Sequence, residues 1–155
     1  MTPSGQTAAR DLAQRRADTM TKLTAPAADV WVASAGDSGA HLVPLSLAWV
    51  DDRAVIAVHE DSRTARDITS SGAARLGLGP TRDVVMLDVR LERTVPVGEP
   101  AGQHLGERYA EQADWDPRTS DGYVFLVLRP DRVQAWREVD EIPGRTLMRD
   151  GGWLQ

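Results

Sequence analysis

A serine, two arginines and a threonine gather in the segment Ser62-Arg63-Thr64-Ala65-Arg66, and these residue types suit a phosphate group. Ser62 is a favourable N-cap, and the first turn of a helix offers unpaired N–H groups and the positive end of the helix dipole. Arg63 and Arg66 are three residues apart and so share a helix face. Guanidinium groups bind phosphate oxygens in a two-pronged fork, and the hydroxyls of Ser62 and Thr64 add donors. The segment predicts a phosphate anchor, with a capped surface helix and solvated arginines as the alternative.

Two predicted apolar strands come before this segment and must position it. The run 41–50 is nearly all apolar, which predicts cover on both faces, one by the core and one by a partner or ligand. Pro44 lies inside the run and predicts an edge strand or a bulge, because proline has no N–H to donate to a ladder. Asp51-Asp52 then turns the chain into a second strand over 53–58.

The remaining pattern is one of short strands separated by turns. An apolar stripe predicts a helix over 8–24, and a spacing of four predicts another over 103–113, whereas residues 1–7 are expected to be disordered. Further strands are predicted over 30–34, 74–78, 84–95, 123–128 and 132–136, with a hairpin in 145–154. Six or seven strands and two or three helices favour a mainly β protein, a barrel with flanking helices rather than an alternating α/β sheet. We expect residues 1–155 to form a single domain.

Composition excludes several classes of function. The chain has no cysteine, which excludes disulfides, thiolate metal sites and a cysteine nucleophile. The net charge of −5 argues against nucleic-acid and acidic-membrane binding. The sequence has no signal-peptide core and no apolar run of membrane-spanning length, so we expect a soluble, cytoplasmic protein.

Other motifs for chemistry are weak. His41, His59 and His104 are scattered without acidic ligands at a fixed spacing, so no metal site is predicted, and His59 is interpreted as a polar wall of a pocket. The sequence lacks a G-x-S-x-G elbow, so a hydrolase triad is unsupported. Residues 77–80 lack the third glycine of a dinucleotide fingerprint and predict a turn.

Four motifs in consistent order, spanning 28–153, resemble a known family. HEDSRTARDI (59–68) is similar to the S-R-K-A-R stretch of the pyridoxamine 5′-phosphate oxidase-like, FMN-binding split-barrel superfamily. The run 41–58 resembles the strand pair that lines the flavin there, and TRDVVMLDVRLE (81–92) resembles the next strand. AWREVDEIPGRTLMRDGGW (135–153) is similar to the closing segment of the oxidase. The resemblance implies a split barrel, an FMN cofactor and a homodimer with the cofactor at the subunit interface.

The resemblance also implies roles for individual residues. Arg63 and Thr64 would hold the FMN phosphate, whereas the other implied contacts lie elsewhere in the chain. Along the isoalloxazine ring, the implied contacts are Pro44, Leu45 and Ser46. Near the polar edge of the ring they are Arg82 and Asp83. From the second subunit, Trp136 and Arg145 would reach the cofactor.

Departures from the family pattern argue against pyridoxamine phosphate oxidation. Thr64 replaces a lysine, Asp83 replaces a glutamine, and Leu147 and Met148 stand where the oxidase has His and Asp for its substrate. The expected activity is therefore hydride transfer between FMN and another small planar substrate, with no side chain assigned as catalytic. One alternative is an F420-dependent reductase on the same fold, favoured by exposed arginines such as Arg66 or Arg75 near the groove and by a composition rich in Ala, Arg and Asp. The other is a non-catalytic flavin-binding or carrier protein.

Overall fold

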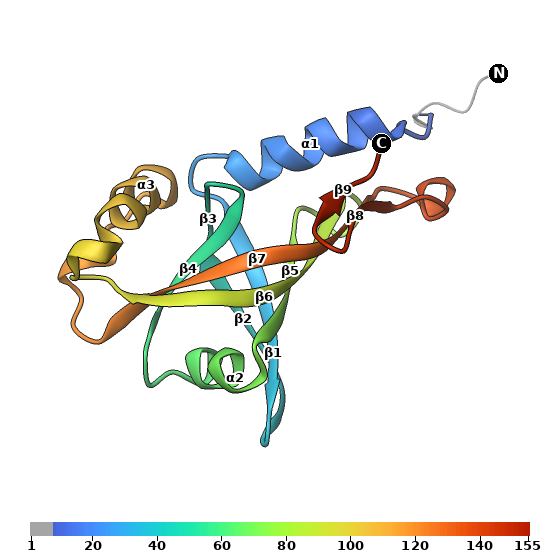
Figure 1. The fold of residues 1–155 in the computed structure, drawn as a ribbon. Coiled ribbons are helices and arrows are strands. Elements are labelled where there is room, and N and C mark those ends of the chain that lie inside the picture. Colours follow the sequence, from blue (N-terminus) through green and yellow to red (C-terminus); the bar gives the residue numbers. More distant parts are fainter. Residues whose placement is uncertain (1–7) are drawn as a thin grey trace.

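The computed structural model describes residues 8–155, which form one antiparallel sheet with helices around it (Figure 1). The order of strands along the sheet is β2-β1-β5-β6-β7-β4-β3. Outside this order, β8 pairs with both β7 and β9. The strands are β1 (Asp29–Gly36), β2 (Gly39–Ser46), β3 (Ala48–Val50), β4 (Arg53–His59), β5 (Ala73–Leu78), β6 (Val84–Pro96), β7 (Tyr123–Trp136), β8 (Thr146–Arg149) and β9 (Gly152–Trp153). The mainly β prediction is confirmed, and the sheet has nine strands rather than six or seven. The predicted disorder of residues 1–7 concerns residues outside those described.

The predicted strand over 41–50 is in fact two strands. Strand β2 pairs with β1, whereas β3 pairs with β4 at the other end of the sheet. The break falls at the fully buried Leu47, whose N–H donates to the carbonyl of Ala28. Apolar character continues across the break because both strands contact the core, so hydropathy could not reveal it. Pro44 lies on the edge strand β2, as predicted.

Strands β6 and β7 form the longest ladder of the sheet. We predicted two strands around Arg129-Pro130-Asp131, and this prediction is wrong, because β7 continues through Pro130. The ladder absorbs the proline with a register shift between Asp88 and Val89, the residue paired with Pro130. A bulge of this kind tolerates a residue without an N–H.

Three α-helices flank the sheet: α1 (Leu12–Thr24), α2 (Arg63–Ser71) and α3 (Gln103–Ala113). The predicted helix over 8–24 begins later, at an N-cap where Asp11 accepts from the Gln14 N–H at 2.8 Å. Short 3₁₀ turns lie at η1 (Pro100–Gly102), η2 (Pro117–Thr119) and η3 (Val139–Glu141). Among the described residues, no helix has the length and hydropathy that a membrane crossing requires.

Two apolar clusters hold the sheet in shape. The larger fills the space enclosed by the curved sheet, with fully buried residues such as Leu47, Ile56 and Leu87. The smaller lies between α3 and the sheet and is centred on Tyr109 and Phe125. Strands β2 and β3 are the two ends of the strand order, and the chain passes directly from one to the other. The sheet is therefore a barrel that is split beside β2.

Candidate functional site

The outer edge of β2 has no strand beside it in the described chain. Gly36 and Gly39 flank a two-residue turn and therefore form a hydrogen-bonded pair. From this pair on, hydrogen-bonded and non-hydrogen-bonded pairs alternate along the ladder of β1 and β2. The pairs of Leu42, Pro44 and Ser46 fall in the second class, and their backbone groups point to the open edge. The missing N–H of Pro44 therefore weakens no bond to β1. The edge presents the N–H and C=O of Leu42, the C=O of Pro44 and the N–H of Ser46.

Helix α2 begins close to the end of this edge that lies at the hairpin tip, near Gly39. Ser62 is its N-cap and accepts from the Ala65 N–H at 3.1 Å, as predicted, and Gly72 ends the helix with a left-handed conformation. This cap uses the Ser62 hydroxyl as an acceptor. The N–H groups of Arg63 and Thr64 find no acceptor in the described part of the chain. The first turn of α2 therefore keeps donors for an anion.

The side chains of the predicted anchor are not equally available. Arg66 is exposed, whereas Thr64 is 4% exposed and faces the core side of the helix. Arg63 reaches the β1–β2 hairpin, where its Nη2 donates to the carbonyl of Gly39 at 3.1 Å. Its Nε is buried without a hydrogen bond and lies 3.7 Å from Asp67 Oδ2. An anion at this helix end would thus find Arg63 and Arg66, with the Asp67 carboxylate beside Arg63 and the exposed carboxylate of Asp61 just before the cap.

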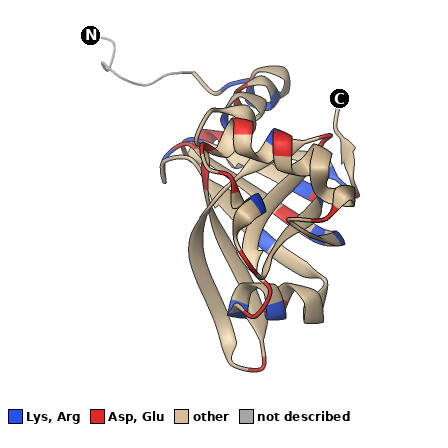
Figure 2. Cartoon of the chain, turned by 90° about the vertical axis from the view of Figure 1, so that its left-hand side faces the viewer, with Lys and Arg blue, Asp and Glu red and all other residues tan. Residues whose placement is uncertain are grey.

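In Figure 2 the two blue residues of α2 lie beside red, acidic segments, and the tip of the β1–β2 hairpin is also red, whereas the strands of that hairpin are tan. The β1–β2 hairpin carries no Lys, Arg, Asp or Glu between Asp29 and its tip at Asp37. Positive charge on α2 is supplied by Arg63 and Arg66 alone. A ligand with one anionic end and one apolar end matches this distribution.

His59 ends β4, three residues before Ser62. Its Nδ1 accepts from the Asp61 N–H at 3.1 Å, and its ring meets Tyr123 edge-on with centroids 5.8 Å apart. Gly122 packs so closely against the imidazole that a Cβ there would overlap it. His59 is therefore a fixed polar wall beside α2. Among the described residues, no cluster of three His, Cys, Asp or Glu side chains is placed to hold a metal.

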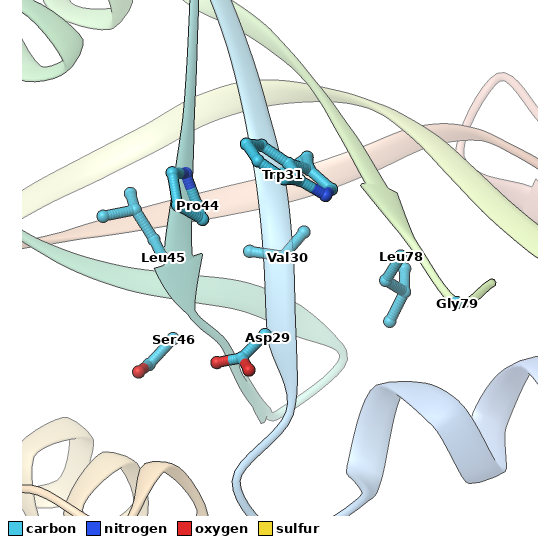
Figure 3. Close-up of a pocket in the computed structure, with 8 residues that line it drawn as sticks. All are labelled: Asp29, Val30, Trp31, Pro44, Leu45, Ser46, Leu78 and Gly79. Carbon is cyan, nitrogen blue, oxygen red and sulfur yellow. The ribbon is translucent and has the colours of Figure 1, made fainter. Parts of the chain in front are cut away.

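A pocket of about 520 Å³ opens at the other end of β2 (Figure 3). It is lined by Asp29, Val30, Trp31, Pro44, Leu45, Ser46, Leu78 and Gly79. Pro44, Leu45 and Ser46 were predicted from the sequence, but the residues from β1 and β5 were not. Alternation in the strand over 30–34 carried the relevant signal, because buried Val30 and Val32 force Trp31 to face outward.

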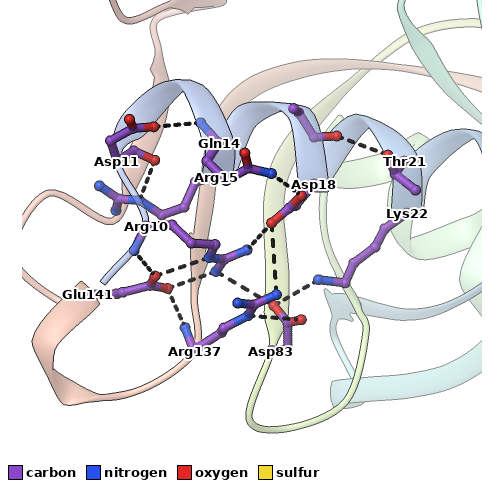
Figure 4. Close-up of polar contacts among 11 residues, drawn as sticks. Arg10, Asp11, Gln14, Arg15, Asp18, Thr21, Lys22, Asp83, Arg137 and Glu141 are labelled. Atoms are coloured by element: carbon purple, nitrogen blue, oxygen red, sulfur yellow. Dashed lines mark hydrogen bonds and ion pairs between the residues drawn. The ribbon is translucent and has the colours of Figure 1, made fainter. Parts of the chain in front are cut away.

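Arg82 and Asp83 lie before β6 and contact other parts of the protein. Asp83 pairs with Lys22 at 2.8 Å and with Arg137 at 3.3 Å (Figure 4). Burial alone would raise the pKa of the Asp83 carboxyl, but the hydrogen bond from Lys22 and the nearby positive charges hold it below its ordinary value. Arg82 is exposed and bonds Glu138 at 2.7 Å. Both side chains are committed to these ion pairs in the single chain.

The same region contains the other two predicted residues. Trp136 ends β7 opposite Val84, and the guanidinium of Arg145 stacks over its ring, 5.2 Å from the centroid. Leu147 and Met148 are buried in the core at 0% and 5% exposure, so they offer no groups to a substrate from this chain.

The predicted site residues therefore fall into separate groups. Ser62, Arg63, Thr64, Arg66 and His59 surround the start of α2, beside the hairpin tip. Pro44, Leu45 and Ser46 line the pocket at the far end of β2. Arg82, Asp83, Trp136 and Arg145 surround the start of β6. The open edge of β2 joins the first two groups, whereas the third is tied to the C-terminal segment.

No family model and no curated protein sequence matches the chain, but solved structures match its fold. A protein described as an F420 reductase is 18% identical with a TM-score of 0.57, over 73% of this chain and 93% of that one. A heme-binding protein from Mycobacterium smegmatis is 16% identical with a TM-score of 0.64, over 92% of this chain and 59% of that longer one. A FAD-binding protein from Mesorhizobium loti is 17% identical with a TM-score of 0.59, over 76% and 89% of the two chains.

The single antiparallel sheet with flanking helices is consistent with a split barrel. At such low identity the likeness concerns the fold. The chain has a split β-barrel fold similar to that of these neighbours, which are typical of the pyridoxamine 5′-phosphate oxidase-like superfamily.

Proposed function

We propose that the protein is an oxidoreductase that binds FMN in the split beside β2 and transfers hydride between the flavin and a small planar substrate. The observation that carries the proposal is the alignment of two features. The open backbone edge of β2 leads at one end to the N-terminus of α2 and at the other to the pocket. An elongated cofactor with an anionic tail and a flat polar head fits that order.

The phosphate end is assigned to the first turn of α2. The free N–H groups of Arg63 and Thr64 and the guanidiniums of Arg63 and Arg66 supply donors and positive charge. The buried Nε of Arg63, which has no hydrogen bond, is one donor that a phosphate oxygen would satisfy after a small side-chain shift. Thr64 contributes its backbone rather than its hydroxyl, because its side chain is buried.

The ring end is assigned to the β2 edge. Flavin rings carry alternating donors and acceptors along one side, and the edge offers the N–H and C=O of Leu42, the C=O of Pro44 and the N–H of Ser46. His59 closes the phosphate side of this edge. When bound, the flavin supplies the redox chemistry. The residues of the chain orient it and shield one face from water.

A homodimer would complete the site. Toward the hairpin tip, the outward face of β1 and β2 exposes Leu42 at 60%, one of the most exposed large apolar side chains of the described residues. Leu42 pairs with Ala33, and Ala35 pairs with Ala40 on the same face, so this part of the face carries apolar side chains. Exposed apolar patches of this kind mark interfaces, and a two-fold axis would pair the patch with itself. Trp136 and Arg145 would then approach the cofactor of the second copy.

F420 is the second candidate cofactor. Arg66 is exposed beside the phosphate end, where the longer acidic tail of F420 would extend, and one structural neighbour is described as an F420 reductase. Arg75, the other arginine predicted to favour F420, pairs with Asp88 at 3.4 Å on the sheet surface. A non-catalytic carrier on the same fold is the remaining alternative.

The decisive measurement is the absorbance spectrum of the purified protein, followed by titration with FMN and with F420. Flavin bands with saturable FMN binding support the proposal. A protein that binds F420 but not FMN favours the second candidate. Binding of neither, at any concentration at which the protein remains folded by circular dichroism, overturns both.

A further inference from the structure

The first residues of β1 and the last residues of β2 form a small two-part surface. Asp29 pairs with Ser46, and Trp31 pairs with Pro44. Paired residues and residues two apart share a face of an antiparallel sheet, so all four side chains lie on the outward face. Both pairs belong to the non-hydrogen-bonded class, in which side chains approach most closely. An aromatic and proline platform thus adjoins a carboxylate and a hydroxyl.

This surface forms the outer part of the 520 Å³ pocket described above. In Figure 3 the carboxylate of Asp29 and the hydroxyl of Ser46 lie side by side, and Trp31 lies beside Pro44 one step along the strands. Leu78 and Gly79 form the opposite rim. The volume falls within the range of small-molecule sites, and Trp31 is 53% exposed. The shape suits a flat ring placed on Trp31 and Pro44 with one edge toward Asp29.

Charge decides which flat ring fits. Asp29 has no ion pair or hydrogen-bonding cation among the described residues. Lys22, the basic residue near the Gly79 rim, is already bonded to Asp83 at 2.8 Å. The pocket therefore carries an uncompensated negative charge. A tryptophan face also attracts positive charge, through its quadrupole.

We propose that this pocket binds a planar nitrogen heterocycle that carries a positive charge, with the ring on Trp31 and its charged edge toward Asp29 and Ser46. The assignment goes beyond cofactor binding by naming a substrate class. It rests on the proposed function only where it calls this ring a substrate, because the pocket adjoins the β2 edge assigned to the flavin. Asp29 is then a specificity residue and Trp31 a platform.

Three pyridine probes of nearly equal shape test the proposal: 1-methylnicotinamide, which is cationic, nicotinamide, which is neutral, and nicotinate, which is anionic. Each is titrated into the full chain, and binding is followed by ligand-observed NMR. We expect the cation to bind about fivefold tighter than the neutral ring and the anion to bind weakest. Trp31→Leu should weaken all three.

Asp29→Asn provides the sharper comparison, because it keeps the shape of the side chain and removes its charge. We expect it to bring the affinities of the three probes within about twofold of one another, whereas Asp37→Asn at the exposed hairpin tip should preserve their order. Circular dichroism checks that both variants are folded. Equal binding of the three probes by the unaltered chain, or an unchanged order in Asp29→Asn, overturns the proposal.

Parallel titrations with FMN separate this inference from the proposed function. We expect Asp29→Asn to keep the FMN affinity of the unaltered chain, and FMN and 1-methylnicotinamide to bind together. If the unaltered chain binds no FMN but still binds the three pyridine probes in the expected order of charge, the flavin assignment is refuted and the pocket assignment stands. Displacement of the cation by FMN shows that the flavin ring itself occupies the pocket, and overturns the inference.

Discussion

Ser34 donates a hydrogen bond to Asp67 across the gap between strand β1 and helix α2, with Ser34 Oγ 3.0 Å from Asp67 Oδ2. Both residues are buried. Asp67 also lies 3.7 Å from the Nε of Arg63, whose Nη2 reaches the hairpin carbonyls. One carboxylate thus fixes the helix that carries the predicted phosphate anchor to the hairpin that carries the open edge. The two parts of the proposed cofactor site are held together by this contact.

Gly36→Ala should strain that contact. A Cβ on Gly36 would overlap the Asp67 carboxylate, which cannot move away without losing Ser34. We expect a loss of about 1–3 kcal/mol in the free energy of unfolding, the usual cost of overpacking. Urea denaturation measures it. Gly98→Ala is the matched control, because its nearest contact is 3.8 Å and its backbone is not left-handed. Equal stability of the two variants would contradict the tight packing inferred for Gly36.

Arg63→Ala should weaken FMN binding. It removes a guanidinium that we assign to the phosphate, and the loss of a charged hydrogen bond is worth about 1.5–3 kcal/mol. Fluorescence titration of FMN gives the affinity. Arg90→Ala removes an exposed arginine of β6 and should leave the affinity unchanged.

Since Arg63 also bonds the hairpin, its loss could act through stability. Asp67→Asn supplies the comparison, because it perturbs the same contact while leaving the guanidinium in place. An anchor role requires Arg63→Ala to lose more FMN affinity than Asp67→Asn. A change below a few tenths of a kcal/mol in Arg63→Ala removes the anchor role.

Leu42→Arg should prevent dimer formation if the part of the outward face of β1 and β2 around Leu42 is the subunit interface. An arginine there places like charges opposite each other across a two-fold axis and removes apolar area from the contact. Sedimentation velocity should show a shift from dimer to monomer. Val139→Arg, at a residue 78% exposed on η3, is the control and should keep the state of the unaltered chain. An unaltered chain that is itself monomeric at micromolar concentration refutes this interface.

Glu141→Gln should lower stability near neutral pH and flatten its dependence on acid. The hydrogen bond from Arg10, 2.7 Å from Glu141, lowers the pKa of that buried carboxyl to about 2, against an ordinary value of 4.5. A lowered pKa means that the ionised carboxylate stabilises the folded chain above about pH 4.5. The stabilisation is lost as the pH falls toward 2.

Replacing one partner of such a buried pair costs about 3 kcal/mol. Thermal unfolding followed from pH 7 to pH 2 measures both effects. Asp140→Asn removes the exposed neighbouring carboxylate and should change the curve little. If Glu141→Gln keeps the acid slope of the unaltered chain, the Arg10–Glu141 pair is not its source.

Sequence patterns predicted features that depend on local chemistry. The cap at Ser62, the helix end at Gly72 and the edge position of Pro44 follow from single residues and their neighbours. The break at Leu47 and the continuous strand through Pro130 could not be predicted, because each depends on the strand that lies opposite. The split-barrel fold was predicted from the order of several motifs along the chain, and no single motif was sufficient.

The candidate site was predictable only in part for the same reason. Arg63 and Ser62 were identified from residue type, but their engagement by the hairpin carbonyls and by the Ala65 N–H reflects three-dimensional proximity. Asp67 could not be predicted as part of the site, because an acidic residue inside a helix gives no sign of a distant partner. Trp31 was not among the predicted site residues, although the alternation of its buried neighbours Val30 and Val32 indicates its outward direction.

Pro44 also affects how the protein behaves at high concentration. An exposed edge strand with a full row of donors and acceptors is a template on which another strand can add, and such addition leads to aggregation. Because Pro44 removes one N–H from the middle of the outward-facing row of β2, a foreign strand would leave a carbonyl unpaired there. The edge remains open to a small flat molecule that needs only a few bonds. It resists the continuous pairing that would polymerise the sheet.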